Sequence, residues 1–249
     1  MNTSVLYGLV GHPLGHSFSA AYFADKFTRE RINAEYRNFD LISVEKLREF
    51  VKEHPNLRGF NVTIPHKQAV LPMLDAISEE AKSIGAVNVV KVERNGRAIK
   101  LHGYNTDCIG FSKSLKPLLR PWHTEALVLG TGGASKAVVY ALKKLGISVS
   151  FVSRQAGEGK MAYADITANT ITTHTLIVNT TPLGMHPNVE SCPPIPYDWL
   201  STRHLLYDLV YNPLETLFMR KGHAAGVYKV KNGLEMLHLQ AEAAWQLWA

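Results

Sequence analysis

The sequence predicts an α/β protein of two domains, the first built on a mixed sheet and the second on a parallel sheet. Short apolar runs alternate with amphipathic stretches along the chain, which is typical of βα units. Asn95-Gly96 between two apolar runs favours an antiparallel hairpin in the first sheet. A new buried strand follows Pro121, and 249 residues are enough for two modest cores.

The first domain is expected to span residues 1–105 and to be completed by a C-terminal helix, 235–249, that folds back onto it. Its strands are β-branched and aromatic, and its helices carry apolar residues at helical spacing. In chain order the expected elements are strand 5–10, helix 18–30, strand 35–41, helix 43–54, strand 59–64, and the hairpin strands 86–93 and 98–104.

The second domain is expected to span residues 106–234. It opens with a connecting helix, 108–119, which should end near Pro117 or Pro121. The stretch between Arg154 and Ile177 is poor helix material, so one crossover helix should be shortened or absent. The remaining expected elements are strand 125–130, helix 135–146, and strands 147–154, 175–181 and 204–212.

The charge balance favours small anionic ligands over nucleic acid. The net charge is +6, but the basic residues stand singly or in pairs and form no basic block. Cys108 and Cys192 form no CxxC pair, so neither a disulfide framework nor a thiolate zinc site is expected.

No metal site or membrane partner is expected either. His12 and His16 have the spacing of a helical metal pair, but Pro13 and Gly15 interrupt the helix. The sequence has no secretory leader and no apolar run long enough to cross a bilayer, so we expect a cytoplasmic protein.

The glycine turn GTGGAS, residues 130–135, lies between an expected strand and an expected helix. Gly130 permits a tight turn, and Gly132 lets the backbone approach a pyrophosphate at the helix N-terminus. Ser135 replaces the third glycine of the usual pattern. This context favours a Rossmann-like dinucleotide site, and an ordinary glycine-rich turn is the alternative.

Arg154 at the end of the next strand indicates which dinucleotide would bind. An acidic residue there would grip the ribose 2′-hydroxyl of NAD, whereas an arginine can pair with the 2′-phosphate of NADP. Lys160 lies within possible reach on the following loop. NADP is therefore the predicted cofactor, and a solvated surface arginine is the alternative.

Lys67 ends the segment NVTIPHK, just after an expected strand. Pro65 suits the first turn of a helix, so Lys67 should lie at a helix N-terminus, where the macrodipole disfavours an ammonium. A partly desolvated lysine there would lose its proton readily, as a proton donor or acceptor working near neutral pH requires. From this stretch alone, a surface lysine is equally consistent with the pattern.

Asp107, Ser17 and Ser19 are similarly ambiguous. Asp107 suits the start of the connecting helix, and a capping role is the simplest interpretation. It could also form a Lys–Asp pair with Lys67 that protonates an alkoxide as hydride arrives. Ser17 and Ser19 could hold a polyol or carboxylate, or only cap a helix.

Taken together, the motifs resemble the shikimate dehydrogenase family over nearly the whole chain. They occur in the family's order: GHPLGHSFS, GFNVTIPHK, GAVN, GYNTD, GTGGAS, NTTPLGM, DLVYNP and the closing NGLEML followed by a glutamine. The resemblance implies NADPH-dependent reduction of 3-dehydroshikimate to shikimate, a step of aromatic amino acid biosynthesis, by a monomer or homodimer.

The resemblance also implies roles for individual residues. Lys67 and Asp107 would be the catalytic pair. The substrate-binding residues would be Ser17, Ser19, Asn61, Thr63, Asn88, Asn105, Tyr211 and Gln240. The cofactor-binding residues would be Gly130, Gly132, Gly133, Ala134, Arg154, Thr180, Met185 and Gly233.

Two departures from the family pattern stand out. Ser153-Arg154-Gln155 occupies a place where members often carry Asn-Arg-Thr, which weakens part of the expected 2′-phosphate clamp. Glu235 stands where many members keep a small residue. Two alternatives also stay open: a quinate/shikimate dehydrogenase that often accepts NAD, against which the Ser17/Ser19 pair argues, and a non-catalytic sensor of a pathway metabolite, against which the Lys67–Asp107 pair argues.

Overall fold

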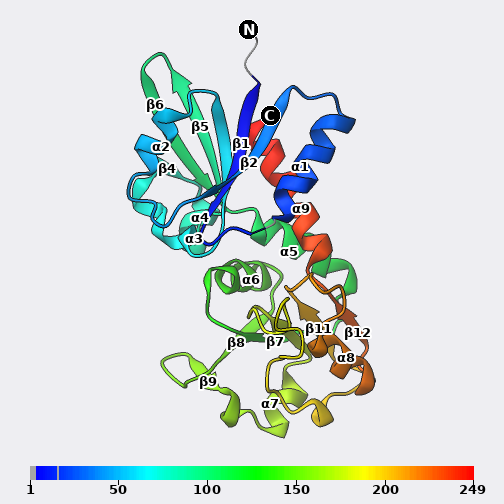
Figure 1. The fold of residues 1–249 in the computed structure, drawn as a ribbon. Coiled ribbons are helices and arrows are strands. Elements are labelled where there is room, and N and C mark those ends of the chain that lie inside the picture. The colour runs from blue at the N-terminus through cyan, green and yellow to red at the C-terminus, as the bar shows by residue number, and fades with distance from the viewer. Residues whose placement is uncertain (1–3, 16) are drawn as a thin grey trace. The chain divides into compact units, whose positions relative to one another are not determined.

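The computed structural model describes residues 4–15 and 17–249, and the chain divides into two compact units. The first unit is Met1–Thr106 with Ala241–Ala249, and the second is Asp107–Gln240. Each unit has its own sheet flanked by helices (Figure 1), which confirms the predicted fold class. The division passes through the C-terminal helix, which the sequence prediction assigned wholly to the first domain.

The first unit has a six-stranded mixed sheet in the order β2-β1-β3-β5-β6-β4. β1 runs parallel to β2 and β3, and β5 runs antiparallel to β3 and β6, so the predicted mixed sheet and hairpin are confirmed. Its strands are β1 (Val5–Gly11), β2 (Ala34–Asp40), β3 (Leu57–Val62), β4 (Ala76–Ile77), β5 (Val89–Asn95) and β6 (Ala98–Tyr104). Its helices are α1 (Phe18–Arg29), α2 (Leu47–Glu53), α3 (His66–Ala69) and α4 (Glu79–Ile84).

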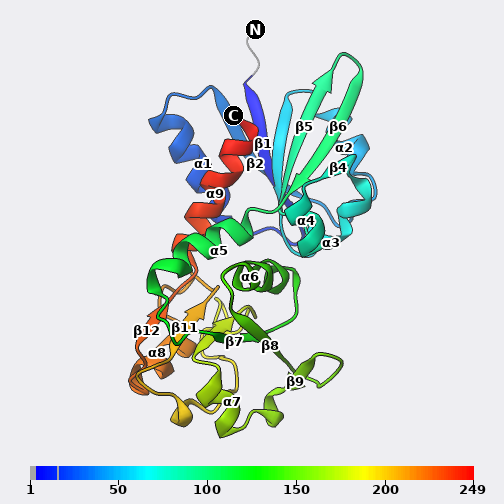
Figure 2. The same cartoon turned by 180° about the vertical axis from the view of Figure 1, so that it is seen from behind.

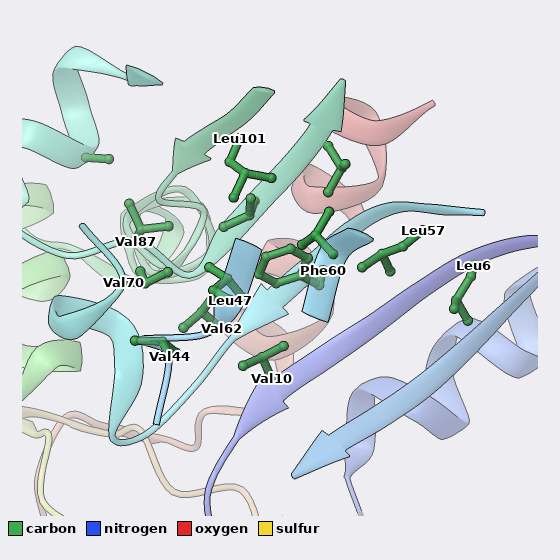
Figure 3. Packing of buried hydrophobic residues seen from close by; sticks show 14 residues of the cluster. Leu6, Val10, Val44, Leu47, Leu57, Phe60, Val62, Val70, Val87 and Leu101 are labelled. Carbon is green, nitrogen blue, oxygen red and sulfur yellow. The ribbon is translucent and has the colours of Figure 1, made fainter. Parts of the chain in front are cut away.

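The alternation of side chains along β1 divides the first core into two layers. Leu6 and Val10 belong to the buried cluster that also contains Leu47 of α2 and Leu57, Phe60 and Val62 of β3 (Figure 3). Tyr7 and Leu9 lie on the opposite face, against α1 and the end of α9 (Leu234–Trp248), which run side by side in Figures 1 and 2. Both faces of the sheet are therefore covered, as expected for its parallel part.

Gly59 of β3 leaves room for the last helix. A Cβ added there would lie 2.3 Å from the indole Nε1 of Trp248, and that nitrogen donates a 3.0 Å hydrogen bond to the carbonyl of Val90. We expect Gly59→Ala to lower the free energy of unfolding by about 1–3 kcal/mol, because the buried ring must shift. Urea unfolding measures this effect.

The matched control is Gly15→Ala, since an added Cβ at that glycine meets no atom within 4 Å. Equal stability of the Gly59 and Gly15 variants would contradict the packing argument.

The second unit has a six-stranded sheet in the order β12-β11-β10-β7-β8-β9, and every neighbouring pair is parallel. Numbered along the chain within this unit, the order is the 3-2-1-4-5-6 arrangement of dinucleotide-binding domains, read from the opposite edge. The strands are β7 (Glu125–Leu129), β8 (Ser148–Ser153), β9 (Lys160–Ala162), β10 (Leu176–Asn179), β11 (Leu205–Asp208) and β12 (Lys229–Lys231). The helices are α5 (Asp107–Leu115), α6 (Gly133–Lys144), α7 (Ala168–Thr173) and α8 (Leu217–Ala224).

Two predicted features of the second unit are confirmed. α5 ends at Leu115, where Pro117 turns the chain into a short 3₁₀ segment. In the crossover after Arg154 the only α-helix is the six-residue α7, whose Ile171 packs in a core with Leu127, Ile177 and Phe218. No helix in the described ranges 4–15 and 17–249 is long and apolar enough to span a bilayer.

Candidate functional site

The two serines near the N-terminus are already engaged in hydrogen bonds. The Ser17 hydroxyl accepts from the amide of Ala20 at 3.1 Å, which caps α1, and donates to Asn38 Oδ1 at 2.8 Å. Ser19 is buried and is hydrogen-bonded to the phenol of Tyr36. The capping role that the sequence left open is therefore observed for Ser17.

Two residues of β2 that sequence reasoning missed hold the loop before α1. Asp40 Oδ1 lies 2.6 Å from His12 Nδ1, and Asp40 Oδ2 accepts from the amide of Leu14 at 3.2 Å. These contacts lower the pKa of Asp40, with the His12 hydrogen bond as the main cause. The side-chain amide of Asn38 reaches the carbonyl of Gly15 at 3.4 Å. The signal available in the sequence is the two polar residues, Asn and Asp, on either side of Phe39 at the strand end. His16, named above for metal spacing, lies outside the described residues.

A chain of buried hydrogen bonds connects Tyr36 of β2 and the carboxyl end of β3 with the segment before β5. Tyr36 donates to Asn61 Oδ1 at 2.7 Å, and Asn61 Nδ2 donates to the carbonyl of Asn88 at 3.3 Å. Asn88 donates from Nδ2 to Thr106 Oγ1 at 3.1 Å and accepts from the Thr106 amide at 2.7 Å. Asn105 is fixed separately, because its Nδ2 donates to the carbonyl of Ala86 at 3.0 Å. The predicted polar residues of the first unit are thus held in set orientations.

Lys67 is the second residue of α3 and is half-buried. The predicted position at a helix start is correct, but Pro65 precedes the helix instead of forming its first turn. α3 has only four residues, so its macrodipole is weaker than the sequence argument assumed. The segment is held by Thr63, whose carbonyl accepts from the His66 amide at 2.8 Å, and by the Lys67 carbonyl, which accepts from Val87 at 2.8 Å.

Asp107, Tyr211 and Gln240 belong to the second unit. Asp107 is the first residue of α5 and is buried. Gln240 is buried on α9, where its Nε2 donates to the carbonyl of Leu237 at 3.0 Å. Tyr211 is half-buried beyond β11, and burial raises its pKa.

The glycine turn follows β7 at the switch point of the sheet, where β7 lies between β8 and β10. Gly130 has a φ of 105°, and a Cβ there would lie 2.8 Å from Thr180 Oγ1, so only glycine fits this turn. Thr180 Oγ1 in turn donates to the carbonyl of Leu129 at 2.7 Å. The ends of β7 and β10 are thereby joined.

The helix after this turn starts two residues earlier than predicted. Gly132 is the N-cap of α6, and an added Cβ there would meet no atom within 4 Å, so the backbone is open to a ligand. Gly133 and Ala134 form the first turn. Ser135 is buried and donates to the carbonyl of Gly132 at 2.6 Å, which explains how a serine fits the place of the third glycine.

A pocket of about 450 Å³ lies beside the glycine turn and beyond the end of β8. Its lining residues are Thr131, Ser153, Arg154, Gln155, Ala156 and Lys160. Two cationic side chains and two hydroxyls are the donors that a phosphate needs. The predicted neighbourhood of Arg154 and Lys160 is confirmed, and Thr131 is a lining residue that sequence reasoning missed.

The remaining predicted cofactor residues, Thr180, Met185 and Gly233, lie on the loops that follow β10 and β12. Met185 is 45% exposed on the first of these loops. Gly233 is packed so closely that an added Cβ would lie 2.1 Å from the carbonyl oxygen of Leu209. Glu235, whose effect the sequence left unexplained, lies in the first turn of α9 and forms an ion pair with Lys231, the last residue of β12.

Comparison with known proteins identifies the family. Residues 9–90 match the model of the shikimate dehydrogenase substrate binding domain. A protein of Caldanaerobacter subterraneus, named shikimate dehydrogenase (NADP(+)), is 39% identical over 99% of this chain and 92% of its own length. The chain belongs to the shikimate dehydrogenase family.

Solved structures of shikimate dehydrogenases agree with this assignment. The Thermus thermophilus shikimate 5-dehydrogenase in complex with NADP(H) and shikimate is 35% identical, with a TM-score of 0.85 over 98% of this chain and 93% of that one. A quinate dehydrogenase from Corynebacterium glutamicum, in complex with NAD, is 27% identical with a TM-score of 0.85, covering 99% of this chain and 94% of that one. The family resemblance of the motifs is therefore confirmed over both units.

Proposed function

We propose that this protein is an NADP-dependent oxidoreductase that reduces 3-dehydroshikimate to shikimate in aromatic amino acid biosynthesis. The observation that carries the proposal is the match to shikimate dehydrogenases (NADP(+)) over 98–99% of the chain. The cationic pocket beside the glycine turn supports NADP as the cofactor, because its two cations suit a 2′-phosphate.

In this proposal the first unit holds the substrate. Ser17, Ser19, Asn61, Asn88 and Asn105 would direct fixed hydroxyl and amide groups at the hydroxyls and carboxylate of shikimate, together with Thr63 on the Lys67 segment. The buried hydrogen bonds that fix Asn61, Asn88 and Asn105 support this role, because preorganised polar groups lose little entropy on binding. Tyr211 and Gln240 of the second unit would complete the set.

Lys67 and Asp107 would move the proton. NADPH, when bound, supplies the hydride to the carbonyl carbon. The Lys67 ammonium then donates a proton to the carbonyl oxygen, and the Asp107 carboxylate stabilises the ammonium before that transfer. In the reverse direction the Lys67 amine removes the proton from the hydroxyl. The hydrogen bonds that fix the Lys67 segment support this role, since small misplacements of a proton donor are costly to the rate.

The second unit would hold the cofactor. Gly130, Gly132, Gly133 and Ala134 would accept the pyrophosphate at the start of α6, where the backbone is open. Arg154 and Lys160 would hold the 2′-phosphate. Thr180, Met185 and Gly233 would border the nicotinamide half.

The absorbance of reduced nicotinamide tests the proposed function directly. Purified protein mixed with shikimate and NADP⁺ is expected to form NADPH, and 3-dehydroshikimate with NADPH is expected to consume it. No turnover in either direction, with both ligands bound, would overturn the proposal and leave the metabolite sensor as the better account.

A second candidate function is oxidation of quinate with NAD. Gln155 favours it, because glutamine stands where family members often have threonine in the 2′-phosphate clamp. The quinate dehydrogenase above, bound to NAD, shares the fold at 27% identity. Turnover of shikimate and quinate with each cofactor separates the two functions. If the protein oxidises quinate with NAD as efficiently as shikimate with NADP, the assignment to shikimate and NADP would be wrong.

The proposal extends to partners and location. We propose that the protein acts in the cytoplasm on small molecules, as a monomer or homodimer, without nucleic acid or membrane partners. The scattered basic residues support this. Among the described residues, no group of three or more His, Cys, Asp or Glu side chains could hold a metal ion.

Lys160 is expected to contribute modestly to cofactor selection. Lys160→Ala should raise KM for NADP⁺ by about two- to fivefold and leave KM for NAD⁺ unchanged, since an exposed ion pair is typically worth about 0.2–1 kcal/mol. Steady-state kinetics with both cofactors provides the measurement. Lys143→Ala, on the last turn of α6, is the control for loss of a positive charge. Identical effects of both variants would contradict a specific role for Lys160.

A further inference from the structure

A fully buried carboxylate lies at the end of β11. Asp208 is 0% exposed, and three neutral groups donate to it. Its Oδ2 accepts from the Thr216 hydroxyl at 2.6 Å, and its Oδ1 accepts from Asn179 Nδ2 at 2.9 Å and from the Val210 amide at 3.0 Å. Burial raises the pKa of Asp208 to about 6, against the opposing effect of these donors.

Through Asn179, the carboxylate reaches the loop after β10. The other amide atom of Asn179, Oδ1, accepts from the Thr181 amide at 3.0 Å and from the Thr181 hydroxyl at 2.6 Å. The Leu183 amide then donates to Thr181 Oγ1 at 3.3 Å. This loop, 180–185, carries Thr180 and Met185 of the proposed cofactor site.

Through Val210 and Thr216, the carboxylate also fixes the chain after β11. Thr216 is the N-cap of α8, where its Oγ1 accepts from the Met219 amide at 3.3 Å. The carbonyl of Val210 accepts from the amide of Gly233 at 3.1 Å. The segment between these anchors, 209–215, carries Tyr211 of the proposed substrate site.

The Asp208 side chain therefore links the two loops. The two backbones are joined where the Leu209 amide donates to the Asn179 carbonyl at 2.9 Å and again where the His186 amide donates to the Asn212 carbonyl at 3.1 Å, and Asp208 adds a side-chain link between them. Within the described part of the chain no cation pairs with Asp208, and burying an unpaired carboxylate costs free energy, so that apolar residues of similar volume often stabilise a core better. The arrangement is more readily explained by a need for fixed loops than by stability alone.

We propose that Asp208 is a positioning residue that holds loops 180–185 and 209–215 in the geometry needed for hydride transfer. This inference rests on the proposed function for the roles of Thr180, Met185 and Tyr211. Asp208 acts through Asn179, Val210 and Thr216, and makes no contact with substrate or cofactor in this role.

The test combines kinetics with amide hydrogen exchange of the full-length protein. Asp208→Asn is expected to lower kcat for shikimate oxidation at least tenfold, because reactants held by misplaced loops align poorly. KM for NADP⁺ should change less than about threefold, since Arg154 and its pocket lie beyond β8. In the protein without ligands, exchange at the amides of Thr181 and Val210 should rise at least tenfold.

Thr216 supplies a second pair of variants in case Asp208→Asn folds poorly. Thr216→Ser keeps the hydroxyl and should retain normal kcat and exchange, whereas Thr216→Val should change both in the direction of Asp208→Asn. Ser114→Ala is the matched control, because it removes a buried 2.7 Å hydrogen bond to Tyr207 in the same unit. It should leave kcat and exchange at positions 181 and 210 unchanged.

Normal kcat and exchange in Asp208→Asn or, if that variant does not fold, in Thr216→Val would overturn the inference. So would an equal loss of kcat in Ser114→Ala. If the wild-type protein does not oxidise shikimate with NADP⁺, the proposed function fails, and hydrogen exchange alone still decides whether Asp208 fixes the two loops.

Discussion

Lys67→Ala is expected to lower kcat for shikimate oxidation by about 10²–10⁴-fold while both ligands still bind. The expectation follows from the loss of a positioned proton donor and acceptor, which typically contributes a factor of this size. Stopped-flow or steady-state absorbance of NADPH measures kcat, and calorimetric titration with shikimate and with NADP⁺ measures binding.

Lys82→Ala is the control for this variant, because Lys82 is an exposed lysine of the same unit that pairs with Glu79 on α4. It should keep normal kcat. A Lys67→Ala protein that binds both ligands and turns over at the wild-type rate would remove Lys67 from the mechanism.

Arg154→Ala is expected to raise KM for NADP⁺ by about 10- to 100-fold and to leave KM for NAD⁺ nearly unchanged. A guanidinium can form two charge-assisted hydrogen bonds with a phosphate, and NAD has no phosphate at this position. The ratio of kcat/KM for the two cofactors is the quantity to measure, and it should shift toward NAD.

The control is Arg97→Ala in the hairpin turn of the first unit, an exposed arginine whose loss changes the net charge equally. The role of Arg154 would be contradicted if KM rose equally for both cofactors, or if Arg97→Ala gave the same shift in the ratio of kcat/KM.

Local sequence patterns predict most of the architecture. The Asn95-Gly96 turn predicts the β5–β6 hairpin, and the glycine turn predicts the β7–α6 junction, because both depend on backbone conformations that few residues adopt. Strand ends are predicted less well. β11 ends at Asp208 although apolar residues continue through Val210, since the buried Val210 contributes to the core while its backbone lies beyond the strand.

Short elements escape prediction for a physical reason. β4 has two residues and β12 has three, so neither shows a measurable alternation, and both form only because an existing sheet offers an edge. α8 carries a usable signal in its N-cap, Thr216, which a search for caps in this stretch would have found. The division of α9 between the units depends on packing alone.

The candidate site is predicted unevenly. Arg154 and Lys67 can be predicted from their residue type and their position at a strand end. The orientation of Asn61 and Asn88 cannot be predicted from the sequence, since it depends on hydrogen bonds between segments distant in sequence. The role of Asp208 cannot be predicted from the sequence either, because its burial and its hydrogen bonds depend on the packing of β10, β11 and the start of α8.

The central claim is that Lys67 and Asp107 act on one substrate hydroxyl, and a crystal structure with shikimate and NADP⁺ bound tests it most directly. The measurement is the distance from that hydroxyl oxygen to Lys67 Nζ and to the Asp107 carboxylate. Our account predicts both distances within about 2.6–3.2 Å, beside the nicotinamide ring. A complex in which either side chain contacts a different part of the molecule, or no ligand at all, would contradict it.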